Sequence, residues 1–308
     1  MKYISFNKEN WQGRIDTEDG ELGLRIHQLV QPYNNQQNAK VLIGFCSEEG
    51  VKRNKGRLGA KSAPDNIRKT LSNLPIHCTE FNLYDAGNII VDEDLEEARK
   101  LQTQKVNEIL ATKSFPMVIG GGHETALGNF LAFIQHFPKD SLVVNLDAHF
   151  DIRMPNPIST SGTPFYEMYQ YCETNGIKFN YLVAGIQQLG NTQALFKRAD
   201  ELKIKYFLAD DIHGNFDAFL NQLTNQLSQY KHIYLSVDMD VLDVAYAPGV
   251  SATTINGLTP YQIKAIINCI QTTKKLKIAD LVEVNPQYDR DQQTAKLASH
   301  LMYNLLTN

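Results

Sequence analysis

Residues 141–151 read SLVVNLDAHFD, a largely apolar run that ends in three regularly spaced polar side chains. Because Leu142 to Leu146 places apolar side chains at nearly every position, a strand there would be buried on both faces. Such strands are typical of a parallel sheet that carries helices on both sides. The stretch therefore predicts an α/β protein with three layers, α/β/α.

Six other β-rich runs surround this strand, at residues 40–46, 115–120, 181–186, 205–210, 232–238 and 278–284. Between them, residues 93–112 repeat apolar side chains at helical spacing, and Thr259-Pro260 is typical of a capped helix start. Strands that alternate with helices predict a mainly parallel sheet. We find no linker, repeat or compositional break. We therefore expect one domain over residues 1–308, with residues 1–38 packed on it as an N-terminal extension.

The composition excludes several classes of protein. With 308 residues, 43% of them hydrophobic and 21% charged, the chain has the make-up of a globular protein with a sizeable core. A formal net charge of -4 argues against a nucleic-acid binder, which needs a broad basic face. Residues 1–13 lack the apolar stretch of a secretory signal, and no run of about 18 apolar residues could span a membrane. We expect a cytoplasmic protein without a nucleic-acid or membrane partner.

Polar side chains with metal-binding chemistry follow three of the strands. After residues 141–146 they stand at positions i, i+2 and i+4, which project to one side of an extended backbone. The run HIYLSVDMD at 232–240 repeats this spacing, and FPMVIGGGH at 115–123 adds an imidazole after three glycines that allow a tight turn. In a parallel sheet the strand ends meet at one edge, where ligands bind. The six candidate metal ligands are His123, Asp147, His149, Asp151, Asp238 and Asp240.

Four carboxylates packed together repel one another and resist ionisation unless cations lie among them. The oxygen-rich ligand set, with two imidazoles and no thiolate, suits manganese better than a structural zinc site. Taken singly, His123 or Asp151 could cap a helix, and Asp240 could form a surface salt bridge. Their joint occurrence at three strand ends favours a site for two manganese ions, which could clamp and deprotonate a bridging water.

Four short motifs, GGGHE at 120–124, DAHFD at 147–151, SVDMDVLD at 236–243 and EVNP at 283–286, resemble those of the ureohydrolase family, which includes arginases, agmatinases and formimidoylglutamases. The resemblance covers residues 44–285 and implies the arginase-like fold, a three-layer α/β/α domain with an eight-stranded, mainly parallel sheet. It implies two Mn2+ per subunit and makes a homo-oligomer possible. One ion would be held by His123, Asp147, Asp151 and Asp238, and the other by Asp147, His149, Asp238 and Asp240.

The loop after DAHFD distinguishes between the branches of this family. Arginases and agmatinases carry a histidine there, whereas this chain reads STSGTPF at 159–165, with Ser161 at the best-matched position. A serine hydroxyl does not titrate near pH 7 and cannot move protons as an imidazole does. DAHFDIR, GIQ at 185–187 and GVKRNKGRLGA at 50–60 are most similar to the formimidoylglutamase branch. That likeness implies hydrolysis of N-formimidoyl-L-glutamate, a small anionic amidine, to L-glutamate and formamide in histidine degradation.

Residues around the metal ligands are candidates for catalysis and substrate binding. Asp151 would orient the attacking hydroxide and accept its proton, and Glu283 would hydrogen-bond the amidine nitrogens. Glu283 could instead form a structural salt bridge or cap. The planar guanidinium of Arg153 suits a substrate carboxylate, although it could pair with a nearby aspartate. Further substrate contacts are expected from Asn54, Arg57, Ser161 and Thr163, of which the two hydroxyls could simply shape their loop.

Two other functions are compatible with the sequence. A guanidine hydrolase of the agmatinase or guanidinobutyrase type would use the same ligands to release urea, but the missing histidine disfavours it. A catalytically silent protein could keep the metal-dependent fold for binding alone, but the complete ligand set and Glu283 argue against this. Hydrolysis of formimidoylglutamate is therefore the leading hypothesis.

Overall fold

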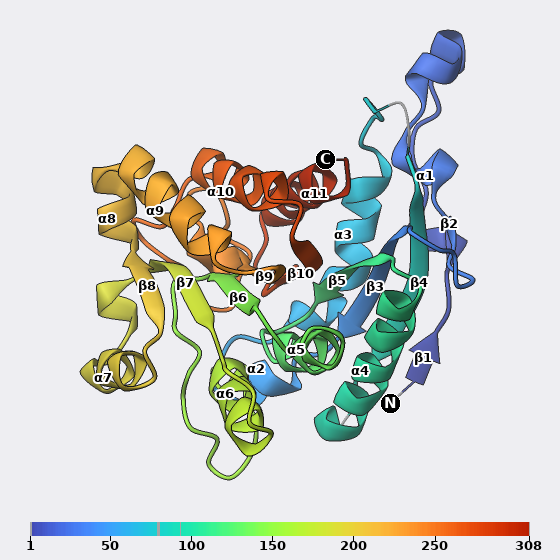
Figure 1. Cartoon of the computed structure of the whole chain (residues 1–308). Coiled ribbons are helices and arrows are strands. Elements are labelled where there is room, and N and C mark those ends of the chain that lie inside the picture. The colour runs from blue at the N-terminus through green and yellow to red at the C-terminus, as the bar shows by residue number, and fades with distance from the viewer. Residues whose placement is uncertain (1, 79–80, 93, 308) are drawn as a thin grey trace.

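The computed structural model describes residues 2–78, 81–92 and 94–307, and a ten-stranded sheet forms its centre (Figure 1). Across the sheet the order is β1-β4-β3-β5-β10-β9-β6-β7-β8, and β2 also pairs with β4. The strands are β1 (Lys2–Ile4), β2 (Gln31–Pro32), β3 (Lys40–Cys46), β4 (Leu83–Ile90), β5 (Phe115–Gly120), β6 (Ser141–Leu146), β7 (Tyr181–Ile186), β8 (Lys205–Leu208), β9 (His232–Asp238) and β10 (Leu276–Val282).

Eight of these strands, β3 to β10, run parallel to one another and form the predicted sheet. The other two lie along the edge strand β4, β1 antiparallel to it and β2 parallel to it. The expected count of eight was therefore too low by two. Strands of three and two residues are too short to show an alternating pattern, and they form only because β4 offers unpaired backbone groups.

The sequence pattern does not predict β4 itself, because Asp85, Gly87 and Asn88 interrupt its apolar side chains. Asp85 is 1% exposed and accepts two hydrogen bonds from the guanidinium of Arg68, of 2.9 and 2.8 Å. The indole Nε1 of Trp11 donates a third, of 2.8 Å. This buried carboxylate is thus fully paired, and it fastens the N-terminal segment to the edge of the sheet.

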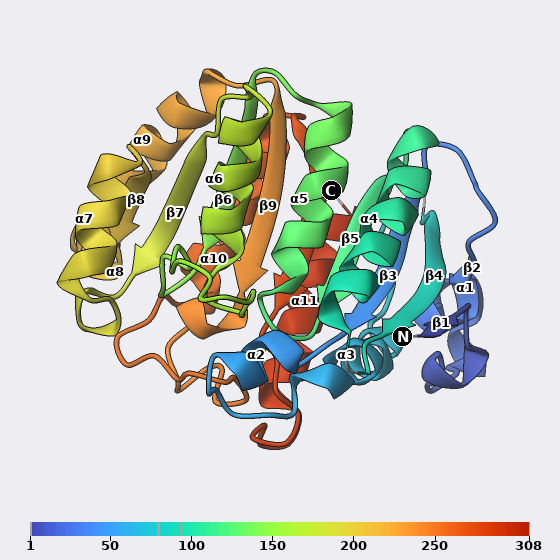
Figure 2. The ribbon, with the colours of Figure 1, turned by 90° about the horizontal axis from the view of Figure 1, so that it is seen from below.

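Helices cover both faces of the sheet and confirm the three-layer prediction (Figure 2). Val143 and Val144 of β6 enter different cores, because successive side chains of a strand point to opposite faces. One core includes α4 (Leu95–Ala111), α5 (Thr125–His136), α6 (Pro164–Thr174) and α7 (Gln193–Glu201). The other includes α1 (Ile26–Leu29), α3 (Ala63–Ser72), α8 (Ala209–Gly214), α9 (Phe216–Ser228), α10 (Pro260–Thr272) and α11 (Gln293–Thr307). The short α2 (Glu49–Arg53) follows β3.

Two predicted helices are confirmed, with small differences at their ends. α4 begins after Asp94, whose side chain caps it, while Glu93 at the start of the predicted range lies outside the described residues. α10 begins at Pro260, and Thr259 forms the expected cap. Across the part of the chain that the structure describes, no helix is long and apolar enough to cross a bilayer.

Two predicted strands end two residues early. The run at 205–210 stops at Leu208, because Ala209 already belongs to α8. The run at 278–284 stops at Val282, because the next residue, Glu283, has a φ of 65° and leaves the extended conformation. The second of these ends lies at the functional edge of the sheet.

Replacing Asp85 by alanine should destabilise the protein strongly, because it leaves the 1% exposed Arg68 guanidinium buried without its counter-charge. Loss of one partner of such a pair costs about 3–5 kcal/mol in free energy of unfolding. Urea denaturation of Asp85→Ala measures this cost. Lys231→Ala, which breaks the exposed pair with Asp140, is the matched control and should have little effect. Equal losses for the two variants would contradict the assignment.

Candidate metal centre

The six candidate ligands come together at the carboxyl ends of three parallel strands. His123 lies in the turn after β5, Asp147 to Asp151 follow β6, and Asp238 ends β9. These strands lie near one another in the order β5-β10-β9-β6, which explains why residues far apart in the sequence meet. The turn after β5 also passes very close to the end of β3. A Cβ atom on Gly121 would lie 1.7 Å from the carbonyl oxygen of Ser47, so only glycine fits there.

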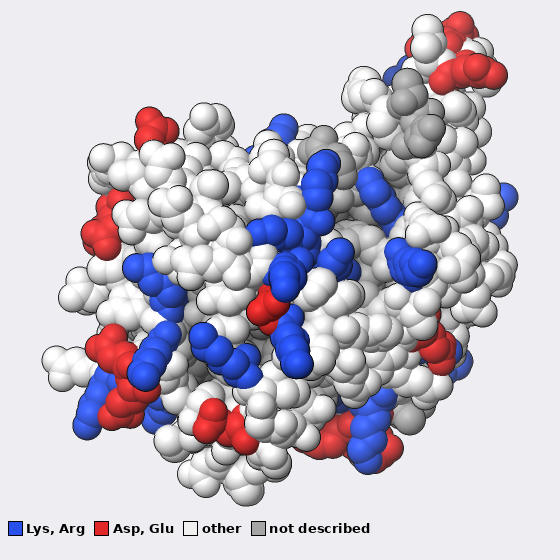
Figure 3. Space-filling model, viewed as in Figure 1, with Lys and Arg blue, Asp and Glu red and all other residues white. Residues whose placement is uncertain are grey.

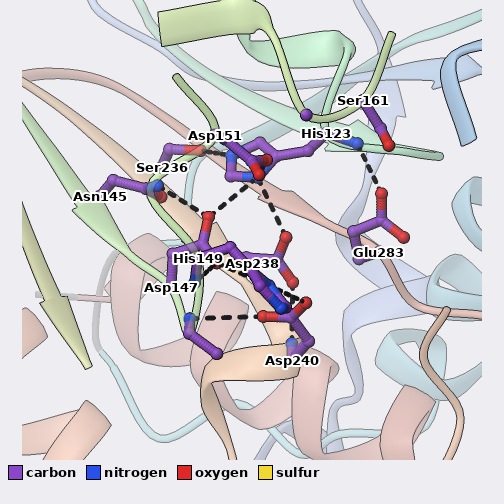
Figure 4. Close-up of polar contacts among 12 residues, drawn as sticks. His123, Asn145, Asp147, His149, Asp151, Ser161, Ser236, Asp238, Asp240 and Glu283 are labelled. Atoms are coloured by element: carbon purple, nitrogen blue, oxygen red, sulfur yellow. Dashed lines mark hydrogen bonds and ion pairs between the residues drawn. The ribbon is translucent and has the colours of Figure 1, made fainter. Parts of the chain in front are cut away.

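The ligand atoms form two groups around the two imidazoles (Figure 4). His123 Nδ1 lies 3.0 Å from Oδ2 of Asp151, 3.0 Å from Oδ2 of Asp238 and 3.2 Å from Oδ2 of Asp147. Within each group the ligand atoms lie within 4.8 Å of one another, and the groups are His123, Asp147, Asp151 and Asp238, and Asp147, His149 and Asp240. Each group could hold one metal ion, and they share Asp147.

In the second group, His149 Nδ1 lies 3.0 Å from Oδ2 of Asp240 and 3.6 Å from Oδ1 of Asp147. The structure therefore places Asp147 between the groups, as the resemblance implies. Asp238 joins only the first group; its Oδ1 accepts a 2.8 Å hydrogen bond from the backbone nitrogen of Asp240.

The hydrogen bonds of His123 indicate that a cation fits beside it. The hydroxyl of Ser236 donates to Oδ1 of Asp280 at 2.6 Å, so its oxygen is left to accept from His123 Nε2, 3.0 Å away. The Nε2 of the imidazole therefore carries a proton. Nδ1 is buried, has no hydrogen-bond partner among the described residues and points at three carboxylates. A metal ion satisfies both the nitrogen lone pair and these oxygens.

Without cations the cluster would retain protons. Burial, together with the charges of Asp240 and Asp147, raises the pKa of the Asp238 carboxyl well above its usual range. Burial lowers the pKa of His123, but the three carboxylates that face its Nδ1 outweigh burial and raise that pKa well above its usual range. Divalent cations compete with these protons, so metal binding releases protons and weakens as the pH falls.

Three residues that support the ligands were not predicted from the sequence. Asn145 donates a 2.8 Å hydrogen bond to Oδ2 of Asp147, while Ser236 and Asp280 orient His123. Asn145 and Ser236 each stand two residues before a ligand, inside an otherwise apolar strand. That spacing puts them on the same side of the strand as the ligand, and it is a signal that the sequence carries. Asp280 lies opposite Ser236 on the neighbouring strand, a pairing that only the register reveals.

Glu283 and Glu124 form a second buried acidic pair beside the ligands. Glu283 Oε1 accepts a 2.8 Å hydrogen bond from the backbone nitrogen of His123, and its Oε2 is buried with no partner among the described residues. Burial and the charge of Glu124 raise the pKa of Glu283 to about 8. Glu124 accepts hydrogen bonds from Ser47 Oγ (2.5 Å) and Gly50 N (3.0 Å), and so ties the start of α2 to the metal-binding turn. The sequence did not single out Glu124.

A polar cavity of about 150 Å³ opens over this cluster. It is lined by Asn54, His149, Asp151, Arg153, Ser161, Gly190, Asn191, Leu195, Asp238, Asp240, Ser251, Ala252 and Glu283. Three of the five predicted substrate contacts, Arg153, Asn54 and Ser161, therefore face the metal ligands across a common space. Asn191, Ser251 and Ala252 come from loops without a recognisable motif, so no sequence pattern singles them out.

The Arg153 side chain packs over Gly162, beside Asn54, whose Nδ2 donates a 3.2 Å hydrogen bond to Ser161 Oγ. In the residues that the structure describes, the guanidinium of Arg153 has no ion pair and no hydrogen bond. The pairing with a nearby aspartate that the sequence allowed is thus not observed. A free guanidinium at the wall of a polar cavity is suited to binding a carboxylate.

The structure does not bring Arg57 and Thr163 to the cavity wall. The Arg57 guanidinium donates to the carbonyl oxygens of Val250 and Ser251 and lies 4.2 Å from the ring centre of Tyr288. Thr163 Oγ1 donates to Glu167 Oε1 at 2.5 Å, near the start of α6. The polar atoms of both side chains already form hydrogen bonds within the protein. Both side chains therefore hold loops around the cavity in place.

Comparisons with known proteins agree with this geometry. Residues 38–307 match the model of the Arginase family. The chain belongs to the arginase family. A formimidoylglutamase from Aeromonas salmonicida is 41% identical over 302 residues, which cover 96% of each chain. A formimidoylglutamase from Clostridium tetani is 37% identical over 324 residues, which cover 99% of this chain and 96% of the relative.

Solved structures of other proteins share the fold of this chain. A formiminoglutamase from Trypanosoma cruzi, solved with Mn2+2, superposes with a TM-score of 0.80 at 27% identity, covering 88% of this chain and 93% of that one. A formimidoylglutamase from Bacillus subtilis superposes with a TM-score of 0.82 at 24% identity, covering 92% and 91%. The family and the arginase-like fold expected from the four motifs are confirmed.

Replacing Ser236 by alanine should weaken manganese binding to this arginase-family protein about 10- to 100-fold, because the imidazole of His123 loses the group that fixes its tautomer. Titration of metal-free protein with Mn2+, followed by calorimetry, measures the change. Ser228→Ala, which removes an exposed hydroxyl at the end of α9, is the matched control and should bind Mn2+ as the unmodified chain does. Unchanged affinity of Ser236→Ala would show that the serine does not orient the ligand.

Proposed function

We propose that the chain is a formimidoylglutamase, which hydrolyses N-formimidoyl-L-glutamate to L-glutamate and formamide in histidine degradation. The observation that carries this proposal is the free guanidinium of Arg153, which shares one cavity with the two groups of metal ligands. Agmatine carries only positive charge and gains nothing from an arginine there, whereas a substrate with carboxylates does. Guanidinobutyrate also has a carboxylate, and the missing histidine after DAHFD disfavours it. The formimidoylglutamase names of the relatives support the same substrate.

Two manganese ions are the cofactor, held by the six residues of the two groups. When bound, the ions act as Lewis acids that lower the pKa of a water molecule and polarise the amidine. Asp151, a ligand that also lines the cavity, orients this water and accepts its proton on a carboxylate oxygen. The same carboxylate then returns the proton to the glutamate nitrogen as the bond between that nitrogen and the formimidoyl carbon breaks.

Glu283 holds the amidine in place. Its Oε2 is buried and has no hydrogen-bond partner in the described part of the chain, and the residue lines the cavity, so this oxygen can accept a hydrogen bond from an amidine nitrogen. An amidinium cation would stabilise the ionised carboxylate, which burial and the charge of Glu124 disfavour. The positive φ of Glu283 turns the side chain out of the sheet toward this position.

Arg153 binds a substrate carboxylate, and Asn54 and Ser161 offer polar contacts beside it. Arg57 and Thr163 do not contact the substrate themselves. They hold in place the loops that carry the substrate-binding residues. The expected cytoplasmic location and the expected lack of a nucleic-acid partner rest on composition and stay predictions.

One assay separates the proposed function from its alternatives. Purified, manganese-loaded protein is supplied with formimidoylglutamate, agmatine or guanidinobutyrate, and formamide, glutamate and urea are measured. We expect formamide and glutamate in equal amounts from the first substrate, and metal analysis should give two manganese ions per chain. Urea without formamide would identify a guanidine hydrolase. No product from any substrate would favour a binding protein.

Replacing Arg153 by methionine should lower kcat/KM for formimidoylglutamate, mainly through KM, because the substrate loses a charge-assisted hydrogen bond worth about 1.5–3 kcal/mol. This corresponds to a loss of about 10- to 150-fold. Manganese content should not change. Lys52→Met, which removes a 65% exposed cation from the neighbouring helix, is the control and should retain full activity. If metal content falls instead, Arg153 supports the ligands rather than the substrate.

A further inference from the structure

A small acidic lobe projects from the body of the molecule. It consists of residues 14–23, whose helical turn (Thr17–Gly23) stands apart at the upper right of Figure 1, and acidic side chains gather on it in Figure 3. The segment contains one basic residue and four acidic ones. It also carries two apolar side chains that face solvent, Leu22 (95% exposed) and Ile15 (59% exposed).

The lobe is fixed to the protein at its base. Arg25 donates hydrogen bonds of 2.9 and 2.7 Å to Oδ2 of Asp16, which is only 8% exposed, and another to the carbonyl oxygen of Asn73. The backbone on either side of Arg25 also bonds to the chain at Leu74 and Ile76. Leu22 is therefore exposed on a segment that is held at its base and is rich in acidic side chains.

Next to the base of the lobe lies a groove of about 580 Å³, well away from the metal ligands. Its walls are α11, the start of α10 and the loop at residues 74–77, and apolar side chains such as Leu74, Leu297 and Leu301 line it. Lys264, His77 and His300 also line the groove and are exposed, whereas no Asp or Glu stands among the described residues that line it. The groove is thus apolar inside and basic at its rim.

We propose that the acidic lobe of one copy of the chain occupies this groove in a second copy. Leu22 would enter the apolar interior, while the acidic side chains beside it would face Lys264 and the two histidines. This arrangement matches the polarity and charge of both surfaces. Leu22 is exposed and the groove is open among the residues that the structure describes.

The lobe and the groove lie where two copies of the chain could each insert a lobe into the groove of the other. The loop at residues 74–77 forms a wall of the groove and also holds the base of the lobe, through the hydrogen bonds of Ile26 N to Leu74 O and of Ile76 N to Leu24 O. The donating and the receiving surface therefore lie side by side. A twofold axis near this loop would let each copy insert its lobe into the other, which forms two equivalent contacts and leaves no groove open.

Sedimentation equilibrium of the full, manganese-loaded chain tests the proposal. We expect a mass of at least twice 34.8 kDa at micromolar concentration. Leu22→Asp should raise the dissociation constant about 10- to 100-fold, because it puts a charge into an apolar groove. Ile255→Asp, at an 80% exposed apolar residue of another loop, is the matched control and should associate as the unmodified chain does. A monomer at all concentrations, or an oligomer that tolerates Leu22→Asp, would overturn the proposal.

Charge-reversal variants at the groove and at the lobe test whether the lobe occupies the groove. Lys264→Glu and Glu21→Lys should each weaken association, since each places like charges at the rim, and the double variant should recover much of the lost affinity. Both residues are exposed, so neither change should affect folding. If the double variant associates no better than the single ones, the lobe is not the segment that fills the groove.

Discussion

The concentration of buried negative charge at one edge of the sheet is the constraint on which the rest of the structure depends. Asp147 is 0% exposed, Asp238 2% and Asp240 4%, and each of them lies close to the imidazole of His123, of His149 or, for Asp147, of both. In a sheet with apolar surroundings such a group of carboxylates is stable only with cations or protons among them. Bound metal ions would therefore stabilise the fold at this point as well as serve catalysis.

The parallel sheet is what makes this concentration possible. Each ligand-bearing strand is buried on both faces, which holds its end in place, and the loops beyond the ends are free to carry polar residues. Polar side chains inside the strands also hold the ligands in place by hydrogen bonds. They are Asn145, Ser236 and Asp280. Buried polar groups in apolar strands are costly, and here each of them orients a ligand.

Much of this could be predicted from the sequence, because periodicity and strand ends are local signals. The spacing of Asp147, His149 and Asp151 indicated ligands directly after a strand. The predicted extended backbone is wrong, because β6 ends at Leu146 and Asp151 has a φ of 49°. The edge strand β4 escaped prediction, since Asp85 is acceptable in a buried strand only through Arg68 and Trp11, which come from elsewhere in the chain. The direction in which the Arg57 side chain points could not be predicted for a similar reason. A cationic side chain in a loop can face either a cavity or backbone carbonyls, and only the packed structure decides.

The covering of β4 has a consequence for the behaviour of the protein in solution. The backbone of an edge strand can pair with any other strand, and exposed edges promote association between chains through growing sheets. Here Lys2–Ile4 pairs with residues 88–90 and Gln31–Pro32 with residues 84–85, so the N-terminal segment occupies the outer side of β4. At the opposite edge, β8 has four residues and begins with the exposed Lys205, a charge that discourages pairing. Residues 2–4 and 31–32 therefore cover an edge that would otherwise be open to pairing between chains, and no described residue from 2 to 32 is a metal ligand or lines the cavity.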